Sequence, residues 1–263
     1  MVLRRIAEPI NDLFFIRTFF KKEKWQFVRK IGSGSYGTAY LIQDPSGKQL
    51  YILKRLNFHK LKSNQARAGF QIETQLLSEL SDVAFPALVQ KGSLNGTPYF
   101  IMEYKAGKTF EQLIFAEGKV FSEHESFTIT ARLLSKLAGL HQMGIVHRDL
   151  RIPNVLADGE RLSIIDFGLA RKLGQEEEGI EADNPRKRVH FTSDLYSLGH
   201  FLLFLLYSGY QPSMKKERTW EEELELFPDS KRIIKKLLMS DVPYSSSMEA
   251  LADINKQIKK YWE

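Results

Sequence analysis

The sequence HRDLRIPN, residues 147–154, places a His, two Arg, an Asp and an Asn within eight positions. Apolar residues flank it, so it is either an ordinary polar turn between core elements or a set of side chains that carries out chemistry. An Asp in a loop that follows an amphipathic helix can accept the proton of an attacking hydroxyl. The amide oxygen of an Asn can hold Mg²⁺. Asp149 and Asn154 are therefore the first candidate site residues.

A second polar motif lies downstream, in IIDFGLA, residues 164–170. Asp166 follows an apolar run of strand type and lies two residues before a Gly, a position that suits an exposed metal ligand. Few protein ligands, all of them hard oxygen atoms, are typical of Mg²⁺ bound to phosphates. Asp166 is therefore a candidate metal ligand.

A glycine-rich motif, GSGSYG at residues 32–37, lies near the N-terminus. Such glycines also occur in plain turns, and a dinucleotide-binding fold would need a helix directly after them. Here a strand follows, TAYLI at residues 38–42. A glycine loop between two antiparallel strands can fold over a triphosphate, because no side chain separates its backbone N–H groups from the phosphates.

Two charged residues follow the glycine motif. Lys54 ends the apolar strand YILK, and Glu73 lies on the helix expected after it. The simpler interpretation is a solvated lysine and a surface carboxylate. If the two side chains pair across strand and helix, the carboxylate holds the ammonium group in place to bind phosphate oxygens.

The pattern of apolar residues divides the chain into two parts. Before residue 103 it predicts a helix over 65–82 and strands at 27–32, 38–44 and 49–54, with two more around the turn at Asn95 and Gly96. After residue 109 it predicts helices over 122–143, 193–207, 229–239 and 248–261. This pattern predicts an α+β fold, in which a β-rich N-terminal lobe and a mostly helical C-terminal lobe meet near residues 103–107 around a cleft.

Composition excludes several kinds of site. The chain has 263 residues, 43% hydrophobic and 27% charged, as in soluble globular proteins. It has no Cys, which excludes disulfides, thiolate nucleophiles and Cys-based metal centres. The longest apolar run, residues 197–209, is too short to span a membrane and predicts a buried helix. The net charge of +6 comes from small basic clusters, and no nucleic-acid-binding module is recognisable.

The first 24 residues have no apolar core and cleavage site of the kind found in signal peptides. Residues 13–20 are largely apolar and are followed by Lys21, Lys22 and Lys24, so weak contact with a membrane surface is one interpretation. We expect instead that this segment packs on the body of the protein.

Each motif alone is weak evidence, but in this order and at these intervals they resemble the motifs of the eukaryotic-like (Hanks-type) serine/threonine protein kinases. The resemblance covers about residues 27–261 and is strongest to small bacterial members. It implies a bilobal kinase fold with an N-terminal extension at 1–24 and a kinase domain at 25–263. Within that domain it implies an N-lobe at 25–103, a hinge at 104–107 and a C-lobe at 108–263. It also implies a cytoplasmic monomer or dimer.

The resemblance implies a role for each candidate residue. Asp149 matches the catalytic base, and Lys54, Glu73 and Arg151 complete the catalytic set. Asn154 and Asp166 match the Mg²⁺ ligands, and Asp194 would anchor the catalytic loop. His147 would be structural, as part of a spine with Leu77, Leu88 and Phe167. The ATP site would comprise Gly32, Gly34, Gly37, Ala39, Ile52, Lys54, Met102, Glu103, Lys105 and Leu156.

The chain also departs from the family pattern. Arg151 stands where a lysine is usual, and Ala39 and Ile52 replace the usual Val and Ala of the adenine pocket, one smaller and one larger. The Ala-Pro-Glu motif is missing, and so is its partner arginine, expected near residues 241–247. The activation segment, between Asp166 and Asp194, is short. It has no Ser, Thr or Tyr between Arg171 and Phe191.

Two hypotheses follow from this activation segment. The glutamates at 176–178 could supply fixed negative charge to Arg148, giving a kinase with no phosphorylation switch, although a solvated loop explains them equally well. The basic run at 186–188 could favour an acidic substrate, or it could be an exposed charged segment.

The implied function is ATP- and Mg²⁺-dependent phosphoryl transfer to a Ser or Thr hydroxyl of a protein substrate, autophosphorylation included. A kinase-fold phosphotransferase for a small molecule is one alternative, favoured by the missing Ala-Pro-Glu motif. A pseudokinase scaffold is another alternative. A scaffold would need none of these residues, so their presence argues against it: Lys54, Asp149, Asn154 and Asp166.

Overall fold

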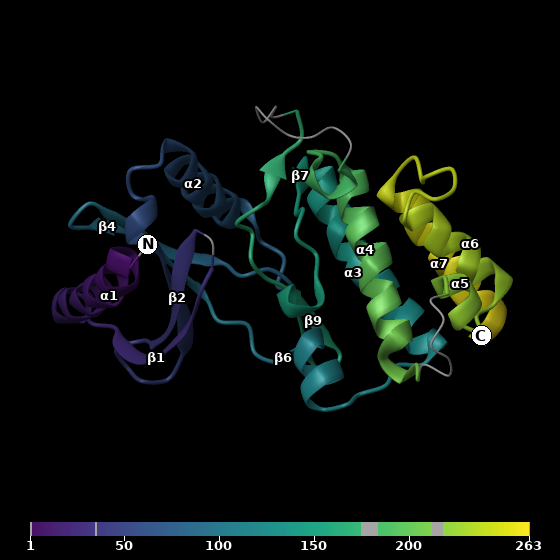
Figure 1. The fold of residues 1–263 in the computed structure, drawn as a ribbon, viewed down its shortest axis with the longest axis horizontal. Coiled ribbons are helices and arrows are strands. Elements are labelled where there is room, and N and C mark those ends of the chain that lie inside the picture. Colours follow the sequence, from purple (N-terminus) through teal and green to yellow (C-terminus); the bar gives the residue numbers. More distant parts are fainter. Residues whose placement is uncertain (1, 35, 175–183, 212–217, 263) are drawn as a thin grey trace. The chain divides into compact units, whose positions relative to one another are not determined.

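The computed structural model describes residues 2–34, 36–174, 184–211 and 218–262 (Figure 1). The chain forms two compact units, Met1–Lys105 and Ala106–Glu263. The first holds an antiparallel sheet and two long helices, and the second is mainly helical. The division lies within residues 104–107, where a hinge is expected.

The sheet of the first unit has five strands in the order β1-β2-β3-β5-β4. Their bounds are Gln26–Ser33 for β1, Gly37–Gln43 for β2, Leu50–Leu56 for β3, Leu88–Leu94 for β4 and Thr97–Glu103 for β5. All neighbouring strands are antiparallel. Asn95 and Gly96 both have positive φ, which matches the twist of a two-residue hairpin turn. The predicted strands and hairpin are therefore confirmed.

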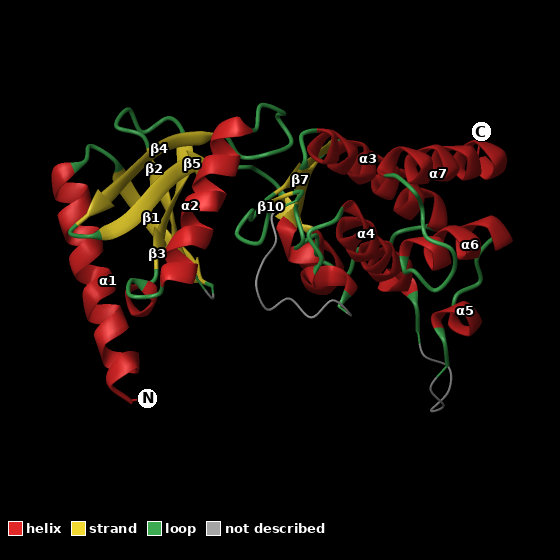
Figure 2. Cartoon of the chain, turned by 90° about the horizontal axis from the view of Figure 1, so that it is seen from above, coloured by secondary structure: helices red, strands yellow, loops and turns green. Residues whose placement is uncertain are grey.

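A helix covers each face of this sheet, as Figure 2 shows for α1 and α2. Helix α2, Asn64–Glu79, begins after Ser63, whose hydroxyl accepts the Ala66 N–H. Its Phe70 ring packs 5.0 Å from the ring of Phe100 in β5. Tyr99 and Ile101, which flank Phe100, belong to the cluster on the other face, because successive side chains of a strand alternate.

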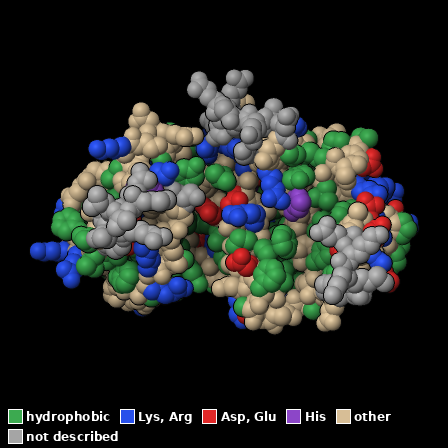
Figure 3. All heavy atoms as spheres, viewed as in Figure 1, with side chains coloured by type: hydrophobic (Ala, Val, Ile, Leu, Met, Phe, Trp, Pro, Cys, Tyr) green, Lys and Arg blue, Asp and Glu red, His purple; other side chains and the backbone are tan. Residues whose placement is uncertain are grey.

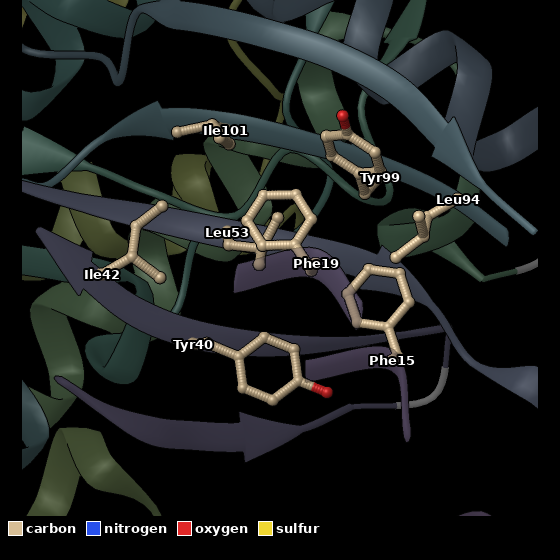
Figure 4. Close-up of a cluster of buried hydrophobic side chains, with 8 residues drawn as sticks. All are labelled: Phe15, Phe19, Tyr40, Ile42, Leu53, Leu94, Tyr99 and Ile101. Atoms are coloured by element: carbon tan, nitrogen blue, oxygen red, sulfur yellow. The ribbon is translucent and has the colours of Figure 1, made fainter. Parts of the chain in front are cut away.

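Helix α1, Val2–Lys22, covers that other face. Its Phe15 and Phe19 are buried in a cluster of eight side chains (Figure 4), whose other members are Tyr40, Ile42, Leu53, Leu94, Tyr99 and Ile101. Burial of an aromatic side chain of this size is the main stabilising contribution available to a surface helix. The expected packing of residues 13–20 is confirmed for Phe15 and Phe19, whereas Leu13 and Phe14 are exposed.

The second unit is built on helices. Their bounds are Glu123–Gln142 for α3, Phe191–Leu206 for α4, Trp220–Glu223 for α5, Pro228–Leu237 for α6 and Ser247–Trp262 for α7. Helix α4 packs against α3 and α6, and α3 packs against α7. Most of α4 is buried, which confirms the core helix predicted from its apolar run. Across the described residues, no helix combines the length and the apolar character that crossing a membrane requires.

The second unit also contains short strands, of which the sequence pattern indicated only the one that precedes Asp166. Strands β6 (Lys108–Thr109), β8 (Val155–Asp158) and β9 (Arg161–Ile164) form one small sheet. Strands β7 (Ile145–Val146) and β10 (Arg171–Lys172) form another. Runs of two to four residues are too short for periodicity to reveal, so the other short strands were missed.

Short helical turns complete the connections. They are η1 (Phe58–Lys60), η2 (Gln112–Ala116), η3 (Ile152–Asn154), η4 (Pro185–Lys187) and η5 (Tyr207–Gly209). On the face drawn in Figure 3, Lys and Arg side chains lie in separate groups and not in one continuous patch, as the small basic clusters of the sequence predict.

Candidate functional site

The glycine motif connects the antiparallel strands β1 and β2, as predicted from the strand that follows it. The Gly34 N–H donates to the Gly37 carbonyl at 2.9 Å. A Cβ at Gly37 would lie 2.9 Å from the Arg55 carbonyl oxygen, so the close approach of β3 requires glycine there. A Cβ at Gly32 or Gly34 would meet no atom nearer than 3.9 Å. The fold explains Gly37, and contact between the backbone and a ligand would explain the other two glycines.

Lys54 and Glu73 are brought together. Because Leu53 and Arg55 face α1, the alternation along β3 directs Lys54 to the α2 side of the sheet. Its Nζ lies 2.6 Å from Oε1 of Glu73, and the side chains are only 15% and 4% exposed. A buried carboxylate without a partner would be strongly destabilising. The pair therefore holds an ammonium group at one place on the sheet.

Of the residues expected around an adenine ring, four lie on strands β2, β3 and β5 of the same sheet: Ala39, Ile52, Met102 and Glu103. Lys105 follows β5 by two residues, and Leu156 lies in β8 of the second unit. Ile52 pairs with Met102 in the register of β3 and β5, and Ala39 pairs with Lys54 in that of β2 and β3. Lys105 Nζ donates to Oε2 of Glu103 at 2.6 Å and to a backbone carbonyl. Since these two side chains engage each other, any role in nucleotide binding rests on their backbone.

Asp149 lies at the centre of the second unit's polar cluster. The guanidinium of Arg151 contacts both oxygens of the Asp149 carboxylate, with Nε 2.7 Å from Oδ1 and Nη2 3.0 Å from Oδ2. Asn154 Nδ2 donates to Oδ2 at 2.8 Å and to the Asp149 carbonyl at 2.9 Å. Hydrogen bonding to Asp149 raises the pKa of Arg151. A lysine could not make this two-pronged contact, so Arg151 orients Asp149 in a way that the more usual residue would not.

His147 is bonded through both ring nitrogens. Its Nε2 lies 3.2 Å from the Ile165 carbonyl, which can only accept, so Nε2 carries the proton. Its Nδ1 accepts the Asp149 N–H at 3.3 Å. The ring is fully buried and packs edge-on against Phe167 at 4.8 Å. These contacts use both nitrogens for the fold, as expected of a structural residue.

Asp194, at the start of α4, binds the backbone of residues 147 and 148, directly before Asp149. It accepts the N–H of His147 at 2.8 Å and that of Arg148 at 2.6 Å. His141 Nε2 lies 2.9 Å from the same carboxylate. Burial alone would raise the pKa of Asp194, but the hydrogen bond and charge of His141 outweigh it, and the pKa is lowered. The ionised form therefore holds Arg148 at its left-handed φ of 65°.

Asn154 and Asp166 lie just outside the two strands of one hairpin. Asn154 directly precedes β8, Asp166 follows β9 by two residues, and Val155 pairs with Ile164. The Ile165 N–H donates to the Asn154 carbonyl at 2.9 Å. Asp166 is exposed. An amide oxygen and a carboxylate on neighbouring strand ends are hard donors of the type that fits Mg²⁺, with its remaining positions filled by water and phosphate.

The activation segment lies partly outside the described residues. Glu176, Glu177 and Glu178 belong to the part not described, so their pairing with Arg148 stays a prediction. Arg148 Nη1 donates to the Leu169 carbonyl at 3.4 Å. In the basic run, the Arg186 guanidinium lies 5.6 Å from the Tyr196 ring centre. Near residues 241–247, where the family pattern has an arginine that this chain lacks, the hydroxyl of Ser245 donates to Glu249 at 2.7 Å.

One member of the site was missed by sequence reasoning. His141 joins α3 to Asp194 and, through Nδ1, lies 2.6 Å from the Ser247 hydroxyl in α7. It stands in the last turn of an amphipathic helix, where a histidine is common at a solvated helix end. No local signal distinguishes such a residue from a buried one that bridges three elements.

Comparisons with known proteins found a matching family model, similar sequences and similar structures. The family model described as "Protein kinase domain" matches residues 25–261. The probable serine/threonine-protein kinase YbdM of Bacillus subtilis is 34% identical over 259 residues, which are 98% of this chain and 99% of that protein. The serine/threonine-protein kinase PrkC of the same organism is 29% identical over 203 residues, 72% of this chain and 31% of that protein.

Among solved structures, the kinase domain of Mycobacterium tuberculosis PknI superposes with a TM-score of 0.68. The alignment covers 89% of this chain and 96% of that one at 21% identity, which supports the fold alone.

Proposed function

Because the chain belongs to the protein kinase family, as a Hanks-type serine/threonine kinase, we propose that it transfers the γ-phosphoryl group of Mg·ATP to a Ser or Thr hydroxyl, its own included. One observation carries the proposal: the Asp149 carboxylate is oriented by Arg151 and by Asn154, and Asn154 itself lies at the end of the β8–β9 hairpin that Asp166 follows. A pseudokinase scaffold has no need of this arrangement.

The chain's own residues mainly position the reactants. Asp149 orients the attacking hydroxyl and accepts its proton. Lys54, held by Glu73, would bind phosphate oxygens, and backbone N–H groups of the glycine loop would donate to the phosphates. Asn154 and Asp166 would hold Mg²⁺, which when bound neutralises charge on the phosphates. Little covalent chemistry is required of the protein, since phosphoryl transfer depends on placement and electrostatics.

Transfer should depend on a divalent cation. Purified wild-type protein incubated with γ-labelled ATP and a generic basic or acidic protein should label both itself and that protein in the presence of Mg²⁺. We expect EDTA to reduce labelling by at least about 100-fold and excess Mg²⁺ to restore it. Without the cation, the oxygen atoms of Asn154 and Asp166 cannot neutralise the charge of the phosphates. The measurement is incorporated label per minute.

The same assay tests the proposal against its alternatives. Absence of labelling by folded protein with Mg²⁺ present would contradict kinase activity, and labelling that persists in EDTA would contradict the metal requirement. A preference for the acidic protein would support the hypothesis that the basic run at 186–188 favours an acidic substrate, whereas equal labelling of the two would contradict that hypothesis.

Arg151→Lys should lower kcat by about tenfold with folding unchanged, because a lysine keeps the charge but replaces the two-pronged contact with a single one. The measurement is initial rate at saturating Mg·ATP. Arg161→Lys, at an exposed arginine of β9, is the matched control and should match wild type. Wild-type kcat in Arg151→Lys would show that the fork to Asp149 does not contribute.

A further inference from the structure

Asn57 lies one residue beyond β3 and three beyond Lys54, and it contacts the glycine loop at three points. Its Nδ2 donates to the Gly34 carbonyl at 2.9 Å, its Oδ1 accepts the Thr38 hydroxyl at 2.8 Å, and its own N–H donates to the Tyr36 carbonyl at 2.8 Å. The Gly34 carbonyl can only accept, so the orientation of the amide follows from chemistry. Asn57 is 3% exposed.

These bonds hold the loop from both sides. Gly34 lies on the β1 side of the turn and Thr38 lies in β2, so one side chain joins the two ends of the glycine motif. A further contact closes the ring, since the Thr38 and Ser33 hydroxyls are 2.9 Å apart. A glycine-rich segment loses more conformational freedom on ordering than any other. Asn57 therefore orders in advance a loop that a ligand would otherwise have to order.

The segment that carries Asn57 is itself held by α1. Arg55 is fully buried and donates to Oδ1 of Asp12 at 2.5 Å, and its guanidinium lies 4.0 Å from the centre of the Phe58 ring. The Phe58 N–H donates to Oε1 of Glu8 at 3.2 Å. Because residues on both sides of Asn57 are bonded to α1, its position relative to the sheet is set by bonds outside the glycine loop as well as by those within it.

We propose that Asn57 is a positioning residue for the triphosphate, one that holds the glycine loop in the conformation that receives phosphates without contacting the ligand. The inference rests on the proposed binding of Mg·ATP. The bonds of the Asn57 side chain go to Gly34 in the loop and to Thr38 directly after it, so its effect should fall on ligands that have phosphates. A merely structural polar residue would instead affect every ligand of the site alike.

The test compares two ligands of one site. Calorimetric titration should show that Asn57→Ala weakens Mg·ATP binding by about tenfold or more while adenosine binding changes less than about twofold. Asn57→Asp keeps the acceptor for Thr38 but sets an oxygen against the Gly34 carbonyl, so it should weaken Mg·ATP binding at least as much. Asn11→Ala, at an exposed position of α1, is the matched control and should leave both affinities unchanged.

Each outcome decides the matter. Mg·ATP affinity within twofold of wild type in folded Asn57→Ala, or equal loss for both ligands, would overturn the proposal. If Asn57→Ala does not fold, Thr38→Val, which removes one of the same bonds, decides by the same ratio of affinities. Failure of the wild-type protein to bind Mg·ATP would instead refute the proposed function, so the two failures are distinguishable.

Discussion

Asp149→Asn should lower phosphoryl transfer by about 10³- to 10⁴-fold while leaving Mg·ATP bound, because the amide keeps the shape of the carboxylate but cannot accept the hydroxyl proton. Its remaining oxygen can still accept from Arg151, so the loop should keep its structure. The measurement is incorporation of label from γ-labelled ATP, into the protein itself and into an added substrate, together with a nucleotide titration of the same preparation.

Asp241→Asn provides the matched control for this change. Asp241 is exposed and its carboxylate accepts only its neighbour's N–H at 2.7 Å among the bonds seen, so the variant should transfer phosphate at the wild-type rate. Equal labelling by wild type and Asp149→Asn would remove Asp149 from the mechanism. Loss of both labelling and nucleotide binding would show that Asp149 contributes to the fold and not to the chemical step.

Asp12→Ala should lower the free energy of unfolding by about 3–5 kcal/mol, because it leaves the charge of Arg55 buried without its main partner. Arg55 has no exposed surface, and both Nε and Nη2 donate to Oδ1 of Asp12, at 3.2 and 2.5 Å. The hydroxyl of Tyr40 and the ammonium of Lys30 also donate to Asp12. Urea denaturation followed by circular dichroism measures the difference.

A double variant separates the charge from the packing. Asp12→Leu with Arg55→Met removes both partners and should recover most of the stability lost by Asp12→Ala, since an apolar pair carries no buried charge. Asn11→Ala, one residue away on the exposed side of α1, should stay within about 0.5 kcal/mol of wild type. A loss below about 1 kcal/mol in Asp12→Ala would show that Arg55 is adequately satisfied by Glu8, 3.7 Å away.

The contribution of Asp12 should also depend on pH. Burial alone would raise the pKa of Asp12, but hydrogen bonds from Lys30, Tyr40 and Arg55 outweigh it and the pKa is lowered. A carboxylate with a depressed folded pKa contributes stability above its unfolded pKa of about 3.9 and loses that contribution as pH falls through the folded value. The stability difference between wild type and Asp12→Ala should therefore be constant near neutral pH and shrink below about pH 4.

Local patterns were sufficient for much of the fold. The helices α3 and α7 begin and end within a residue or two of the predicted bounds, because periodicity and caps such as the Ser122–Glu125 box act within one turn. The Asn95–Gly96 hairpin followed from residues that tolerate positive φ. The motif residues Asp149, Asn154 and Asp166 could be found for the same reason, since the side chains of a loop or hairpin end lie close together in the sequence.

What the sequence alone established, then, is the resemblance to the family, the order of the longer strands and of most helices, and the residues of short motifs, all of which depend on interactions between near neighbours. Only the tertiary structure showed that Arg55 is buried against Asp12, that His141 meets Asp194, and that Asn57 joins the ends of the glycine loop. In the sequence, Arg55 and Asp12 are polar residues 43 positions apart, and each looks solvated. A polar side chain in a strand or helix carries no local sign of its partner, because that partner is set by how elements distant in the chain pack together.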